Sequence, residues 1–179
     1  MAVIFISYAH RDQDRAAIVA DRLRETGWDV WIDVHELRPL EKFTEEIRDG
    51  IRGCSVFLAL YSTAYDDSRY CALEFGYAAE TCGKTLACVV LDRDCPWKDS
   101  TCSFLLGSLS VPGFGRDSET PEQLRALADD VMRSSAFLAL KDYRERGSGE
   151  PMPAVRLDDR PQLRLRAPPE KIAISRRFR

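Results

Sequence analysis

The sequence has 179 residues, which is enough for one domain with some length left over. An apolar fraction of 45% and a charged fraction of 31% are typical of an ordinary globular protein. The net charge of −3 argues against nucleic acid as a partner. No apolar run approaches the ~18 residues of a membrane span and no signal peptide is recognisable, so we expect a cytoplasmic protein without a membrane partner.

The six cysteines do not form a metal-binding pattern. They are separated by 17, 11, 6, 7 and 7 positions, so no Cys-x-x-Cys pair exists, and the only histidines are His10 and His35. Several of the cysteines lie in apolar segments, where a thiol behaves as a small hydrophobic group. We therefore expect reduced cysteines and no metal site.

The first third of the chain alternates between apolar runs and amphipathic stretches. Residues 2–7 form a β-branched apolar run, which is typical of a strand buried on both faces. A helix is predicted over 12–26 and ends at Gly27. A second strand follows over 28–32, and then a polar loop, 33–42.

The same alternation continues through the middle of the chain. A helix over 43–52 precedes a third strand over 54–61. The next helix covers about 67–82 and ends at Gly83, and a fourth strand runs from 85 to 91. An edge strand is predicted near 109–111, and a last helix runs from Pro121 to about 143.

Strands that alternate with helices predict an α/β fold with a parallel sheet and helices on both faces. With five strands, the flavodoxin-like order 2-1-3-4-5 is expected. Ligands of such sheets bind beyond the carboxyl ends of the strands at the switch point, here between the first and third strands. We assign residues 1–145 to this domain. The Pro- and Arg-rich residues 146–179, with a local charge of +5 over 156–179, are expected to form a flexible or extended basic tail.

The most unusual segment runs from Ser62 to Glu74. It starts where the third strand ends and enters an otherwise apolar helix that carries one carboxylate. A glutamate flanked by Cys71, Ala72, Leu73 and Phe75 bears a desolvation cost that most surface glutamates avoid. Such a residue either reaches solvent through a cleft or has a chemical role. Cys71 lies on the core stripe without a neighbouring histidine, so we interpret it as a packing residue.

These residues together resemble the Toll/interleukin-1 receptor (TIR) domain family, and most closely its NAD-cleaving members. The resemblance covers roughly residues 1–140. It rests on the order and spacing of the following segments: residues 4–8, 27–33, 33–43, 62–74, 83–84, 89–91 and 96–97. It implies a TIR fold in innate immune or cell-death signalling, and self-association with other TIR domains through the 33–43 loop. Many family loops have a glycine where this chain has Leu40.

The resemblance implies cleavage of the nicotinamide–ribose bond of NAD, giving nicotinamide and either ADP-ribose or a cyclic derivative. Glu74 is the implied catalytic residue. A single carboxylate suffices, because nicotinamide leaves as a neutral molecule and needs no general acid. The chain lacks a Gly-x-Gly-x-x-Gly motif after its first strand, so we interpret NAD as the substrate and expect no cofactor.

Further residues are expected to contact NAD. Arg11 would pair with the diphosphate, Phe43 would lie near the nicotinamide, and Tyr70 would form a wall of the site. Ser7 and Ser62 would bond to the ribose, although both are also suited to cap the ends of their strands. The complete set of predicted substrate contacts is Ser7, Tyr8, Arg11, Asp33, Phe43, Ser62 and Tyr70.

Two other functions fit parts of the same pattern. A non-enzymatic TIR adaptor would act by TIR–TIR association through the 33–43 loop, and it would not need Glu74. A nucleoside deoxyribosyltransferase also breaks an N-glycosidic bond on a flavodoxin-like sheet with a glutamate, although the segments 4–8 and 96–97 fit the TIR family better.

Overall fold

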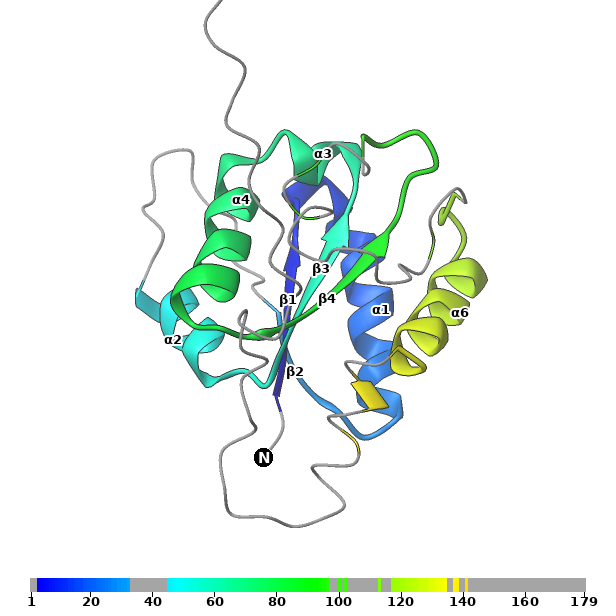
Figure 1. Ribbon diagram of the computed structural model, residues 1–179. Helices are drawn as coiled ribbons and strands as arrows, with labels where there is room; N and C mark the ends of the chain where they lie inside the picture. The colour runs from blue at the N-terminus through cyan, green and yellow to red at the C-terminus, as the bar shows by residue number, and fades with distance from the viewer. Residues whose placement is uncertain are drawn as a thin grey trace, which may run out of the picture.

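The structure is a computed structural model that describes residues 3–32, 45–96 and 117–134, together with the single positions 100, 102, 113, 137, 138 and 141. Within these residues, four parallel strands form one sheet in the order β2-β1-β3-β4, with helices on both faces (Figure 1). The predicted α/β fold and the order of its first four strands are therefore confirmed. The predicted fifth strand, the 33–43 loop and the 146–179 tail lie outside the described residues.

The sheet brings the ends of its two central strands together. Its strands are β1 (Val3–Tyr8), β2 (Asp29–Ile32), β3 (Val56–Tyr61) and β4 (Thr85–Val90). The register pairs Ser7 with Ala59 and Tyr8 with Leu60, so the carboxyl ends of β1 and β3 lie side by side. The strand order reverses at this point, which is where open α/β sheets bind ligands.

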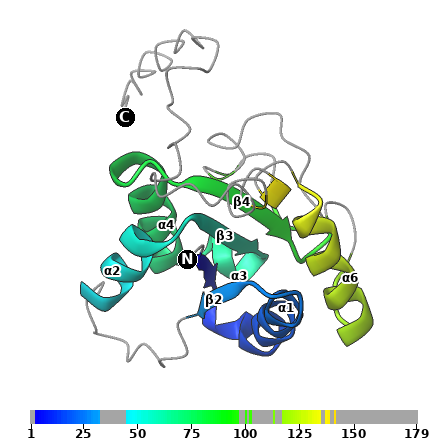
Figure 2. The ribbon, with the colours of Figure 1, turned by 90° about the horizontal axis from the view of Figure 1, so that it is seen from below.

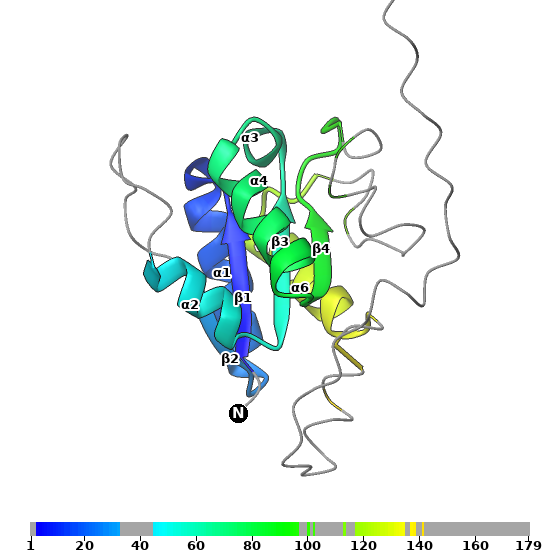
Figure 3. The ribbon, with the colours of Figure 1, turned by 60° about the vertical axis from the view of Figure 1, so that its left-hand side comes forward.

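Helices cover the two faces in pairs. On one face lie α1 (Gln13–Glu25) and α6 (Pro121–Met132), and on the other lie α2 (Glu45–Gly53) and α4 (Arg69–Gly76) (Figure 2). Three short elements complete the described fold: η1 (His10–Asp12) before α1, α3 (Thr63–Asp66) after β3, and the π-helical turn η2 (Tyr77–Thr81) after α4. Both β1 and β3 point toward the end of the sheet where α3 lies (Figure 3).

Successive side chains of β1 enter different halves of the core. Ile4 and Ile6 pack in the cluster between the sheet and the α1–α6 pair. Phe5 points to the α2–α4 face, where its ring stacks on Trp31 and Phe57 with centroids 4.5 and 5.4 Å away. Burial of this strand on both faces, as predicted, accounts for its continuous apolar run.

The helix predicted over 67–82 is confirmed as α4 and its continuation η2, and a further helical turn that was not predicted precedes it. Ser62 caps a separate helical turn, α3, and Ser68 caps the start of α4. Each serine side chain accepts a hydrogen bond from a backbone N–H of the turn that follows it, which stabilises a new helix start. The segment between β3 and Glu74 therefore contains two capped helix starts.

The helix predicted from Pro121 to about 143 starts as predicted but is interrupted after Met132. Thr120 and Gln123 form a reciprocal capping box around Pro121. Helix α6 ends at Met132, where the N–H of Ser134 bonds to a carbonyl only three residues back, and residues 137, 138 and 141 are helical again within the predicted range. Serine also competes for backbone hydrogen bonds and so disfavours a helix interior.

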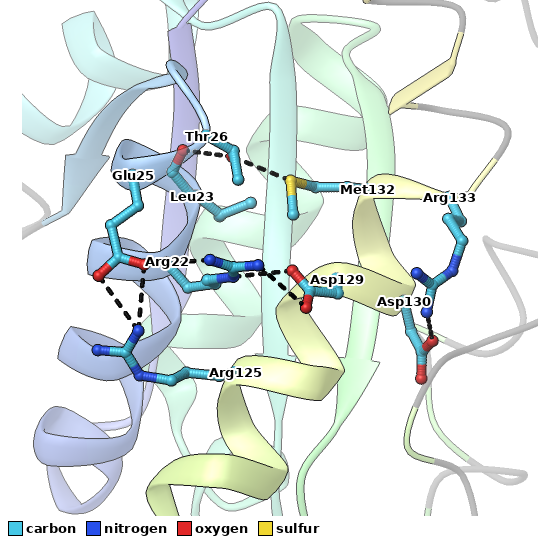
Figure 4. A network of polar contacts seen from close by, with 9 residues as sticks. All are labelled: Arg22, Leu23, Glu25, Thr26, Arg125, Asp129, Asp130, Met132 and Arg133. Atoms are coloured by element: carbon cyan, nitrogen blue, oxygen red, sulfur yellow. Dashed lines mark hydrogen bonds and ion pairs between the residues drawn. The ribbon is translucent and has the colours of Figure 1, made fainter.

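Polar contacts join α1 to α6 along their outer edges (Figure 4). Nε of Arg22 lies 2.8 Å from Oδ1 of Asp129, and Nη1 of Arg125 lies 3.1 Å from Oε2 of Glu25. Water screens such partly exposed ion pairs, so each contributes little to stability. The buried side chains between the two helices, Leu23 among them, provide the main attraction.

Candidate active site

Glu74 is buried at the carboxyl end of the central strands. It lies on α4 with 7% of its surface exposed, and its Oε2 accepts a hydrogen bond of 2.6 Å from Oγ of Ser7. Ser7 occupies the carboxyl end of β1, beside β3. Hydrogen bonds to a buried carboxylate offset part of its desolvation cost. The structure therefore brings two of the predicted site residues together at the expected switch point.

Tyr65 extends this contact into a chain of hydroxyl groups. Its phenolic oxygen lies 3.0 Å from Oγ of Ser7. Because the single hydroxyl hydrogen of Ser7 is donated to Glu74, Tyr65 is the donor of the second bond. Burial raises the pKa of Tyr65 well above its ordinary value, and the nearby Glu74 carboxylate adds to the effect, so the phenol keeps its proton.

Ser62 holds the start of α3 and also contacts a buried aspartate. Its Oγ accepts from the backbone N–H of Tyr65 at 3.0 Å and lies 2.5 Å from Oδ2 of Asp12, to which it donates. Only 1% of Ser62 and 5% of Asp12 is exposed. The interpretation of Ser62 as a cap after its strand is therefore confirmed, and its hydroxyl hydrogen already has an acceptor.

Arg15 joins the elements around this aspartate. Its Nη1 lies 2.9 Å from Oδ1 of Asp12 and 2.8 Å from Oδ1 of Asp92, just beyond β4. The other oxygen of Asp92 accepts from the backbone N–H of Thr63, at 2.9 Å. The remaining nitrogens of Arg15 donate to the carbonyls of Leu91 and Ser118. This network fixes the starts of α1 and α3 relative to the end of β4.

The other predicted contacts are more dispersed. Tyr8 packs against the core between the sheet and the α1–α6 pair, on the other face of the sheet from Glu74. Arg11 is exposed on η1, and Tyr70 is half-buried on α4, one turn before Glu74. Asp33 and Phe43 lie outside the described residues. The roles of all these residues toward NAD stay predictions.

The thiols near the site are packing groups. Cys71 lies in the core cluster of the α2–α4 face, and burial raises its pKa to about 12. Burial likewise raises the pKa of Cys102 to about 12, so neither thiol is a ready nucleophile at neutral pH.

Among the residues that the structure describes, no group of three or more His, Cys, Asp or Glu side chains is placed to hold a metal ion. In that same part of the chain, no helix has the length and apolar character needed to cross a membrane.

Sequence reasoning missed Asp12, Arg15, Tyr65 and Asp92. A signal existed for Tyr65, which lies inside the segment between Ser62 and Glu74, and for Asp12, which follows the first strand within five residues of Ser7. Arg15 and Asp92 carry no local signal, since only the folded sheet brings them together across 77 positions.

Comparison with known families decides the classification. The model of the family described as TIR domain matches residues 4–128. The chain belongs to the TIR domain family. Among curated relatives of this TIR domain is the probable 2′ cyclic ADP-D-ribose synthase BdTIR of Brachypodium distachyon, which is 34% identical over 80 residues. That match covers 44% of this chain and 36% of the relative, so the chain spans little more than a third of the relative's length.

Two solved structures are also similar to this TIR domain. One contains the TIR domains of the activated Roq1 resistosome that directly recognises the pathogen effector XopQ, with 14% identity and a TM-score of 0.48. It covers 83% of this chain and 100% of the matched one. The other is the TIR domain of the Toll-related receptor TRR-2 of Hydra magnipapillata, with 17% identity, a TM-score of 0.48, and coverage of 60% and 81%.

Proposed function

We propose that this TIR domain cleaves the nicotinamide–ribose bond of NAD, with Glu74 as the catalytic carboxylate. The observation that carries the proposal is the buried Glu74 carboxylate, bonded by Ser7 at the carboxyl ends of β1 and β3. The similarity to a probable 2′ cyclic ADP-D-ribose synthase supports a reaction on NAD. Membership of the TIR family supports the same assignment.

The chemistry requires one negative group next to the anomeric carbon. The C–N bond breaks with its electron pair leaving on the pyridine nitrogen, so nicotinamide departs neutral. Positive charge then grows on the ribose ring, and a fixed carboxylate in a site of low dielectric stabilises it. Capture by water gives ADP-ribose and a proton, and capture by a hydroxyl of the same molecule gives a cyclic product and a proton.

The contacts in the structure refine the roles proposed for Ser7 and Ser62. Ser7 donates its hydrogen to Glu74 and so supports the carboxylate, while a lone pair of its oxygen accepts from Tyr65. Ser62 donates to Asp12 and caps α3, so toward a ribose hydroxyl it would act as an acceptor.

The remaining proposed contacts surround this pair. Exposed Arg11 would meet the diphosphate, and half-buried Tyr70 would form a wall of the site one turn from Glu74. Tyr8, Asp33 and Phe43 complete the proposed set. NAD is the substrate in this scheme, and no cofactor takes part.

The wider setting is proposed on the same basis. The domain would extend over residues 1–145 and act in the cytoplasm in immune or cell-death signalling, with residues 146–179 as a basic tail. Self-association through the 33–43 loop would bring several copies together and raise activity. Because assembly depends on concentration, activity per molecule is expected to increase with protein concentration.

The direct test is incubation of the purified protein with NAD at several protein concentrations, with nicotinamide and the ribose product identified by chromatography. Wild type is expected to release nicotinamide, and Glu74→Ala is expected to release none. Glu80→Ala is the matched control, because Glu80 is an exposed glutamate on the turn that continues the same helix. Equal rates for wild type and Glu74→Ala, at zero or above it, would overturn the proposal and favour an adaptor.

A further inference from the structure

We infer that Tyr65 is a positioning residue of this site: its hydroxyl orients Ser7 so that the Ser7 hydrogen points at Glu74. The inference rests on the proposed function, because it assigns Tyr65 to the same carboxylate. Tyr65 does not itself touch Glu74 in this scheme. It acts through one serine hydroxyl that lies between the two residues, 3.0 Å from the phenolic oxygen and 2.6 Å from the carboxylate.

The need for such a residue follows from the freedom of a serine hydroxyl. The hydrogen of Ser7 rotates about its C–O bond and can face any acceptor within reach. A donor on the lone-pair side of the oxygen removes this freedom, since the hydrogen then points away from that donor. Successive hydroxyl groups in such a chain also polarise one another, which strengthens the last bond. The last bond here is the one to Glu74.

Tyr65 is itself held at both ends, which suits it to this role. Its backbone N–H bonds to Ser62, which in turn donates to Asp12. Its ring is buried and packs beside the ring of Tyr61, with centroids 5.6 Å apart. Because neither the backbone nor the ring can shift easily, the phenolic oxygen stays at one position beside Ser7. The network around Asp12 thereby extends to the carboxylate.

The alternative is that Tyr65 has only a structural role in the core, where its hydroxyl has a hydrogen-bond partner but does not orient Ser7. The chain offers a matched comparison, because Tyr61 is also a buried tyrosine and its hydroxyl bonds to Asp66. Tyr61→Phe and Tyr65→Phe therefore remove the same atom from neighbouring rings. Only the second removal reaches Ser7.

The experiment measures kcat and KM for NAD in wild type, Tyr65→Phe, Tyr61→Phe, Ser7→Ala and the double variant Tyr65→Phe/Ser7→Ala. Tyr65→Phe is expected to lower kcat about tenfold with KM changed less than about twofold, as for loss of one charge-supporting hydrogen bond. Tyr61→Phe is expected to leave kcat within about twofold of wild type. In the double variant, Tyr65→Phe is expected to add less than about twofold to the effect of Ser7→Ala, because the chain is already broken.

Two kinetic results would overturn the inference. One is a kcat for Tyr65→Phe equal to that of Tyr61→Phe, and the other is full additivity with Ser7→Ala. A crystal structure of Tyr65→Phe gives a readout that needs no turnover, since the Ser7–Glu74 contact is expected to lengthen or to show alternate rotamers. An unchanged contact would refute the positioning role even if wild type cleaved NAD normally. If wild type did not cleave NAD but Tyr65→Phe lost the Ser7–Glu74 contact, the positioning role would stand and only the proposed function would be refuted.

Discussion

Ser62→Ala removes one hydroxyl that bonds in two directions. Ser62 caps α3 by accepting from the N–H of Tyr65, and it donates to the carboxylate of Asp12. With 1% of the residue exposed, water has little access to replace either bond. The substitution therefore leaves an amide donor and a carboxylate oxygen without their partner.

The two losses have different sizes. Loss of an N-cap serine costs about 1 kcal/mol. Loss of a hydrogen bond to a buried charged group costs about 1.5–3 kcal/mol, and the lower end applies because Oδ1 of Asp12 keeps its contact with Arg15. The free energy of unfolding should therefore fall by about 2.5 kcal/mol. Ser68→Ala removes a cap from half-buried Ser68 and should cost only about 1 kcal/mol.

Urea denaturation monitored by circular dichroism measures these differences, provided that the free energy of unfolding depends on urea concentration with the same slope in each variant. In an Asp12→Ala background, Ser62→Ala should cost only the cap, about 1 kcal/mol. The reasoning that this hydroxyl connects α3 to the buried aspartate would be refuted by either of two results. One is an equal loss of free energy of unfolding in Ser62→Ala and Ser68→Ala, and the other is an undiminished loss for Ser62→Ala in the Asp12→Ala background.

Two further predictions concern burial and backbone strain. Burial raises the pKa of Cys54 and Cys71 from 9.0 to about 12, so between these values the two thiols keep protons in the native state that they lose in the unfolded chain. Their contribution to the free energy of unfolding should be constant near neutral pH and fall above about pH 9, and a free energy of unfolding that stays flat from pH 8 to pH 11 would contradict this. Gly113→Ala should lower the free energy of unfolding by about 3 kcal/mol, because φ is +82° and a Cβ would lie 2.1 Å from the carbonyl oxygen of Val90. In the control Gly53→Ala, the new Cβ meets nothing within 4 Å and should change the melting temperature little. Equal melting temperatures for the two variants would disprove the clash.

Local pattern predicted most of the described fold. The apolar run of β1, the helical stripe of α1 and the turn at Gly27 each depend on neighbours in sequence, and each lies where the pattern indicated. The additional turn α3 was missed because its four residues are too few to show an apolar stripe, so only the cap at Ser62 marks it.

The site was predictable only in part, for a related reason. Glu74 and Ser7 could be proposed from strand ends and an isolated charge, although their contact spans 67 positions. The bonds of Asp12 to Ser62 and of Arg15 to Asp92 span 50 and 77 positions and depend on the register of the finished sheet. No periodicity in one chain encodes such pairs.

Glu74→Gln gives the most direct measurement of the central claim, that a negative charge at this position drives cleavage of NAD. The amide oxygen of glutamine can still accept the hydrogen bond from Ser7, so the contact survives while the charge is lost. The account predicts a folded protein with an unchanged melting temperature and a rate of nicotinamide release at least about 100-fold below wild type. Nicotinamide release by Glu74→Gln within a few-fold of the wild-type rate would contradict it.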